Sequence, residues 1–75
     1  MKMRPTYIDN EDKARLAVEA WKSEAADAQI RHLQLAIESL ELGRMYYEQK
    51  GSEKGAGRMR RCIVLLKQRC DELEK

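Results

Sequence analysis

The sequence predicts an all-α fold, and three observations support this prediction. The 75-residue chain is 43% hydrophobic and 37% charged, a mixture typical of helices with one solvated face. Residues that favour strands are scarce, since the only valines are Val18 and Val64. Pro5 is the only proline, so few positions interrupt a helix. Apolar residues recur at steps of three and four along most of the chain. A chain of this length predicts a single domain over residues 1–75, with a small core.

The N-terminal part of the chain predicts a short tail followed by one long helix. Residues 1–8 are expected to form the tail, and residues 9–50 the helix. Asp9 is a suitable N-cap, and acidic residues follow it in the first turn, where the helix dipole favours negative charge. Gly43 is the only glycine or proline between residues 10 and 50, so the favoured interpretation is a continuous helix.

Two apolar series within residues 9–50 leave an alternative open. The first series comprises Ala14, Val18, Trp21, Ala25 and Ala28, and the second comprises Ile30, Leu33, Ile37, Leu40 and Tyr47. The step from Ala28 to Ile30 turns the apolar face by about 200°. Either the buried face is broad, or the chain bends near residues 23–29 and forms a three-helix bundle.

The C-terminal part predicts a loop and a shorter amphipathic helix. Residues 51–57 hold three of the four glycines and are expected to form the loop. A helix is expected over residues 58–75, and the two helices would form a hairpin. The apolar residues of the helix over residues 58–75 repeat at steps of four and three: Met59, Ile63, Leu66, Cys70 and Leu73.

The unequal lengths of the two predicted helices indicate self-association. A helix over residues 10–50 would be about 60 Å long, and the second helix only about 25 Å. The second helix would leave Val18, Trp21 and Ala25 uncovered, so we expect a homodimer or another protein to bind there. Trp21 is the expected anchor, because tryptophan often dominates binding energy. If the chain bends instead, a monomer would bury this stripe internally.

Charge is distributed unevenly along the chain. Residues 9–50 carry nine acidic and six basic residues, whereas the segment between Glu53 and Asp71 carries six basic residues and no acidic one. This segment predicts a contact surface for an anionic partner, which would be an acidic protein or nucleic-acid phosphate. The alternative is that these basic side chains pair with the acidic helix or are simply solvated. The basic residues are Lys54, Arg58, Arg60, Arg61, Lys67 and Arg69.

The motifs that would indicate catalysis or a cofactor are missing from the sequence. His32 is the only histidine, and its neighbours on a helix provide no partner for proton transfer or metal binding. Residues 51–57 lack the Gly-Lys-Ser or Gly-Lys-Thr of a phosphate-binding loop. Cys62 and Cys70 would lie about 12 Å apart on one helix, too far for a disulfide, so free thiols are expected. A bridge between two chains is the alternative.

These observations predict a non-enzymatic protein-interaction module, such as a small adaptor, regulator or inhibitor, with no cofactor and no metal. Two alternatives are a nucleic-acid-binding regulator that uses the basic second helix and a structural oligomerisation element. The sequence contains no run of about 18 apolar residues, so no membrane contact is expected. The basic N-terminus is followed by acidic residues rather than an apolar segment, and a cytoplasmic location is expected.

Overall fold

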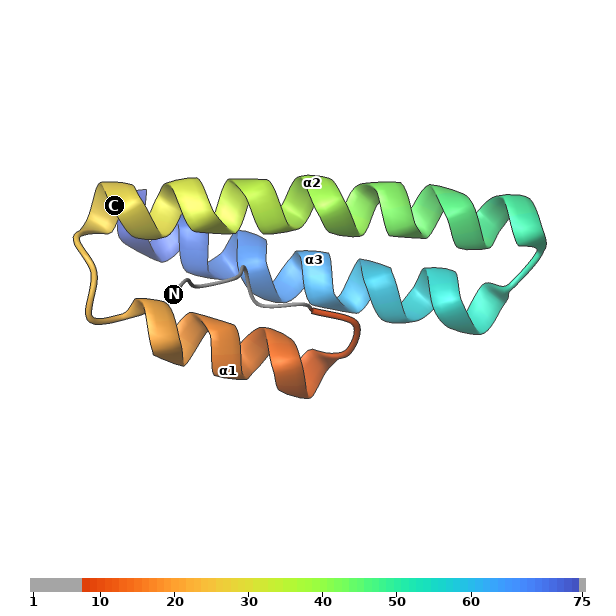
Figure 1. Ribbon diagram of the computed structural model, residues 1–75, viewed down its shortest axis with the longest axis horizontal. Helices are drawn as coiled ribbons and strands as arrows, with labels where there is room; N and C mark the ends of the chain where they lie inside the picture. The colour runs from red at the N-terminus through yellow and green to blue at the C-terminus, as the bar shows by residue number, and fades with distance from the viewer. Residues whose placement is uncertain (1–7, 75) are drawn as a thin grey trace, which may run out of the picture.

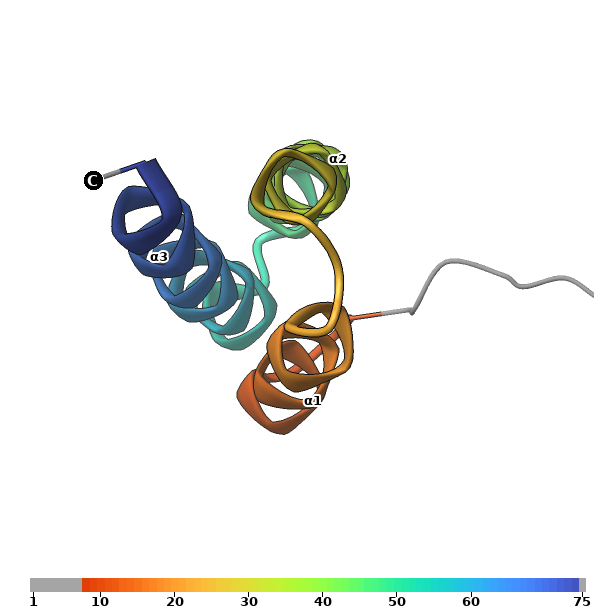
Figure 2. The ribbon, with the colours of Figure 1, turned by 90° about the vertical axis from the view of Figure 1, so that its left-hand side faces the viewer.

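The computed structural model describes residues 8–74 and contains three helices in this part of the chain (Figure 1). They are α1 (Glu11–Trp21), α2 (Ala26–Lys50) and α3 (Glu53–Glu74). Helices α1 and α3 run in one direction and α2 runs in the other, and α3 packs against both (Figures 1 and 2). Residues 8–74 include no strand, and the predicted all-α class is confirmed. None of these helices has the length and apolar character needed to cross a bilayer.

The prediction of one continuous helix over residues 9–50 is wrong, because the helix ends after Trp21 and the next begins at Ala26. Lys22 is the C-cap of α1, and Ala25 has an extended backbone with ψ at 153°. Two apolar series that point in different directions cannot both face one core on a straight helix, whereas a bend turns both inward. The N-cap of α1 is Asn10 rather than Asp9, since the Asn10 side chain accepts a hydrogen bond from the Lys13 amide at 2.8 Å.

A buried amide side chain closes this bend. Gln29 is 5% exposed and donates from Nε2 to the Glu24 carbonyl at 2.7 Å and the Lys22 carbonyl at 3.5 Å. Its Oε1 accepts from Nη2 of Arg69 on α3 at 3.1 Å. These bonds satisfy carbonyls that a helix end would otherwise leave without partners, and they connect the bend to the third helix.

The predicted loop over residues 51–57 is also wrong, because only Gly51 and Ser52 separate α2 from α3. Gly51 ends α2 in the left-handed conformation with φ at 79°, which glycine adopts at little cost. Ser52 acts as an N-cap, since its Oγ accepts from the Gly55 amide at 3.2 Å. Glycines 55 and 57 therefore belong to α3. With 25 residues in α2 and 22 in α3, the length difference that predicted an uncovered stripe disappears.

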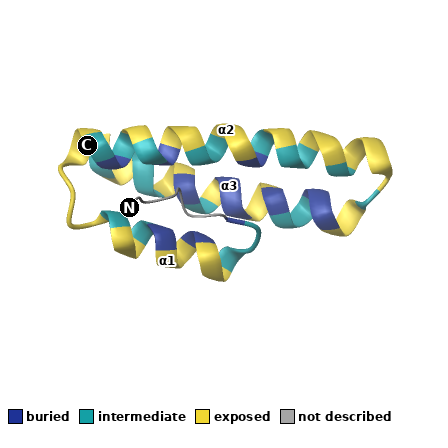
Figure 3. Ribbon diagram, in the orientation of Figure 1, coloured by how far each residue is buried: buried dark blue, intermediate teal, exposed yellow. Residues whose placement is uncertain are grey.

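The core is small and lies where the three helices meet (Figure 3). Helix α1 contributes only alanines to its fully buried part, which allows its backbone to approach α3 closely. The apolar series predicted for the last helix is confirmed, since Met59, Ile63 and Leu66 are buried. The predicted tail lies outside the described residues except for Ile8, which joins the core. The buried cluster comprises Ile8, Ala14, Ala17, Leu33, Leu40, Met59, Cys62, Ile63 and Leu66.

We predict that Gln29→Ala lowers the free energy of unfolding by about 1–3 kcal/mol, because it leaves buried polar groups without partners. Urea unfolding followed by circular dichroism measures this loss. Gln34→Ala is the matched control, since Gln34 is exposed on the same helix and its replacement should change stability by less than about 0.5 kcal/mol. Equal effects of the two variants would show that the Gln29 bonds do not hold the bend.

Two glycines in the first turns of α3 should respond in opposite ways to alanine. A Cβ at Gly55 would overlap the ring of Tyr47, whereas at Gly57 it would meet the ends of two flexible side chains, Arg61 at 3.5 Å and Arg60 at 4.0 Å. Gly57→Ala should stabilise the protein by up to about 1 kcal/mol through helix propensity. Gly55→Ala should destabilise it by about 1–3 kcal/mol through overpacking. Thermal unfolding measures both, and a stabilising Gly55→Ala would contradict the close packing of Tyr47.

Candidate functional site

The stripe predicted to bind protein does not form an exposed surface. Val18 and Trp21 are half-buried and pack against the core, while Ala25 lies exposed in the bend. The Trp21 ring stacks on His32 with centroids 5.2 Å apart, and His32 Nε2 lies 2.9 Å from Glu24 Oε1. The bend brings Trp21 and Glu24 to His32. A search for partners three and four residues away on one helix therefore misses them.

The six basic residues of the predicted contact patch point in different directions. Arg58 donates from Nε to the Asp9 carbonyl at 2.8 Å, and its guanidinium lies 5.8 Å from the centre of the Tyr47 ring. Arg69 binds Gln29 and Glu72. Both of these arginines therefore stabilise contacts between parts of the fold. The remaining four residues, Lys54, Arg60, Arg61 and Lys67, are exposed.

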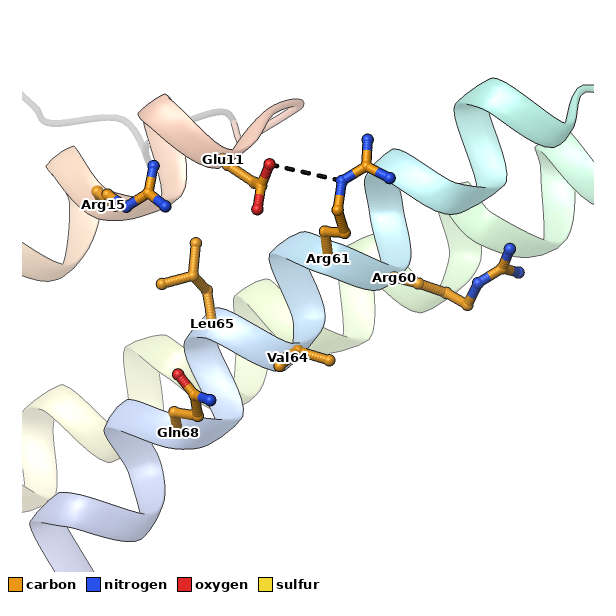
Figure 4. Close-up of a pocket in the computed structure, with 7 residues that line it drawn as sticks. All are labelled: Glu11, Arg15, Arg60, Arg61, Val64, Leu65 and Gln68. Carbon is orange, nitrogen blue, oxygen red and sulfur yellow. Dashed lines mark ion pairs between the residues drawn. The ribbon is translucent and has the colours of Figure 1, made fainter.

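Two of these exposed residues contribute to an open groove between α1 and α3 (Figure 4). Arg60 and Arg61 line it from α3, and Arg15, which the sequence did not single out, lines it from α1. Leu65 points toward α1, and the neighbouring Val64 is 54% exposed. We call this surface the α1/α3 groove, and its lining residues are Glu11, Arg15, Arg60, Arg61, Val64, Leu65 and Gln68.

The ion pairs around the α1/α3 groove are exposed and long. Arg61 Nε lies 3.4 Å from Glu11 Oε1, and Arg60 Nη1 lies 3.4 Å from Glu48 Oε2. Arg15 Nη1 lies 3.7 Å from Asp12 Oδ1. Such pairs contribute at most about 1 kcal/mol each, because water competes for both partners. The lining itself carries three arginines and one glutamate, a net charge of +2. Carboxylates of another molecule can therefore replace the present partners at little cost.

A second exposed feature lies on α2. Large apolar side chains occupy the face of this helix that points away from the core, so α2 is apolar on two sides. In the sequence, this stripe is visible as steps of seven and four residues from Leu35 to Leu42 to Tyr46. The apolar series that forms the core runs through the same stretch of the chain and obscures it. We call these residues the outer α2 stripe: Leu35 (60% exposed), Leu42 (67%), Met45 (49%) and Tyr46 (55%).

Within residues 8–74, no group of three or more His, Cys, Asp or Glu side chains is arranged to hold a metal ion. The chain matches no protein-family model, no curated protein and no solved structure.

Cys62 and Cys70 form no disulfide within the chain, and burial raises the pKa of each thiol. Cys62 is fully buried, and the Glu11 carboxylate raises its pKa further. Cys70 is half-buried, with Glu74 and Asp71 adding to the effect. A raised pKa lowers the fraction of reactive thiolate at a given pH.

We predict that a thiol reagent at pH 8 labels the folded chain in two phases, with Cys70 reacting before Cys62. Both should react more slowly than in the urea-unfolded chain, because unfolding removes burial. Labelling kinetics measure the phases, and Cys70→Ser assigns the faster one by removing it. Labelling of the folded chain at the unfolded rate at both positions would contradict the burial.

Proposed function

We propose that this chain is a non-enzymatic protein-interaction module and that the α1/α3 groove binds an acidic, amphipathic segment of another protein. The observation that carries this proposal is an apolar floor, formed by the exposed Val64 and the half-buried Leu65, in a groove that arginines from two helices also line. Apolar side chains of the partner would cover the floor, and its carboxylates would meet the arginines.

The apolar floor supports a protein partner. Covering exposed apolar surface contributes about 25 cal/mol per Å², so Val64 and Leu65 favour a partner that brings apolar side chains of its own. The groove lies along two helices, a shape suited to an amphipathic helix that presents side chains at three- and four-residue steps.

The arginines give the preference for acidic residues. Each guanidinium can bind a carboxylate with two parallel hydrogen bonds, and such charged bonds are stronger than neutral ones. Arg60 and Arg61 belong to the contact patch predicted from the sequence, and Arg15 adds to them from α1. A bound partner would exclude water from these pairs and strengthen them.

Two features favour protein over nucleic acid at this site. The apolar floor of the groove offers nothing to a sugar-phosphate backbone. Among residues 8–74, no aromatic residue lines the groove, whereas single-strand binders commonly stack bases on aromatic rings.

We predict that a helical peptide of glutamate and leucine shifts the amide NMR signals of Val64, Leu65 and Gln68 and that a matching lysine and leucine peptide does not. Arg60→Glu/Arg61→Glu should weaken binding of the acidic peptide by about tenfold or more. The control Lys54→Glu/Lys67→Glu makes the same charge change on the same helix, at exposed residues with no hydrogen-bond or ion-pair partner in the described chain. It should bind nearly as tightly as the wild type.

Equal loss in the control would reduce the effect to net charge and overturn the proposed groove. Shifts of the groove signals by the basic peptide would do the same. Titration with a short DNA duplex at low salt provides the other comparison, because phosphate contacts are strongest there. If the duplex bound and Arg60→Glu/Arg61→Glu abolished that binding, the partner of the groove would be nucleic acid rather than protein.

A further inference from the structure

The outer α2 stripe is a row of exposed apolar side chains along one face of the helix, with Glu38 and Ser39 between Leu35 and Leu42. At about 100° per residue, Leu35, Leu42 and Tyr46 lie within about 40° of one another around the helix, and they extend over about 16 Å. Met45 widens the stripe on one side. Side chains of this size at these exposed fractions leave roughly 400 Å² of apolar surface uncovered, an area similar to the largest apolar patch of a monomeric protein, which is often functional.

The described part of the chain does not cover this stripe. Leu33 and Leu40, on the opposite side of α2, are buried in the core. Helices α1 and α3 both lie on that side, as the view along the molecule shows (Figure 2). Another molecule can therefore approach the stripe without meeting α1 or α3.

We propose that the outer α2 stripe is a homodimer interface in which α2 of a second copy packs antiparallel against it. Leu35 and Leu42 are equally far from a point between Glu38 and Ser39. A two-fold axis at that point places Leu35 of each copy against Leu42 of the other, so the stripe is complementary to itself. The stripe lies apart from the α1/α3 groove, and this inference does not depend on the proposed function.

The extent of α2 suits such a dimer. Its 25 residues span about 37 Å, and two helices of this length pack along ridges and grooves formed by side chains at three- and four-residue steps. A stable interface buries about 800 Å² on each partner. The stripe supplies about half of that area, and the polar residues beside it on the same face supply the rest.

Charges on the same face select the antiparallel orientation. Arg31 lies one turn before Leu35, and a parallel dimer would place the two copies of Arg31 side by side. The antiparallel arrangement separates these two arginines by about 22 Å and places each near Tyr46 of the other copy, whose ring has the Lys50 ammonium 5.6 Å from its centre. Glu38 stays near the axis and meets its own copy, so its charge opposes the dimer.

A dimer of this kind would display two α1/α3 grooves. Binding at one groove would raise the effective concentration at the other, which strengthens binding to a partner with two acidic segments.

The test is the solution mass of the purified full chain, measured by light scattering and by sedimentation from about 1 to 500 μM, the range of weak to moderate association. We expect the mass of two chains at the upper end. Leu35→Glu/Leu42→Glu should weaken association by about 30-fold or more, because it places charges within an apolar interface. Glu38→Gln should tighten association several-fold by removing the like-charge pair.

Leu16→Glu is the matched control, since Leu16 is also 67% exposed but lies on α1. It should dimerise like the wild type, and circular dichroism confirms that each variant is folded. A wild type that stays monomeric over the whole range overturns the proposal and leaves the stripe to a different protein. Unchanged dimerisation of Leu35→Glu/Leu42→Glu overturns it as well, because the interface would then lie elsewhere.

Disulfide trapping tests the orientation in a Cys70→Ser background, where the remaining Cys62 is buried. Ser39→Cys lies beside the proposed axis and should form a cross-linked dimer on oxidation. Arg31→Cys should not, because the antiparallel arrangement separates its two copies by about 22 Å. Efficient cross-linking through Arg31→Cys, or none through Ser39→Cys, would overturn the antiparallel dimer.

Discussion

The hydrogen bonds of the Gln29 side chain join the bend after α1 to the C-terminal part of α3, which lies 40 residues further along the sequence. Its amide nitrogen binds carbonyls in the bend after α1, and its oxygen binds Arg69 near the end of α3. An open end of a helix needs partners for its carbonyls, and here a buried side chain supplies them. The position of α1 against α3, and with it the α1/α3 groove, depends on this bend.

The arginines divide into those that stabilise the fold and those that remain available to a partner. Arg58 and Arg69 bind carbonyl or amide oxygens at the edges of the core. Arg60 and Arg61 lie on the exposed side of the same helix and form only long, exposed ion pairs. One basic segment thus serves both purposes, because successive residues of a helix point in different directions.

The small core accounts for the two surfaces on which the proposals rest. Buried positions on α1 are alanines, which bring the helix close but cover little of α3, so Val64 stays exposed beside it. Helix α2 has one side in the core and a second apolar side, the outer α2 stripe, facing solvent. Residues 8–74 cover neither surface, and exposed apolar surface of this kind is often a site of interaction.

The sequence by itself determined the all-α class and the buried face of the last helix, because the steps from Met59 to Ile63 to Leu66 place all three on one side whatever surrounds them. It also indicated Arg60 and Arg61 as members of a basic segment. Only the tertiary structure decided where the chain bends and where α3 begins. Ala26 and Ala28 favour a helix locally, and the bend is held by a contact between residues 29 and 69. Glycines at 55 and 57 resemble a loop in composition, yet the approach of the Tyr47 ring explains why position 55 within the helix has no side chain.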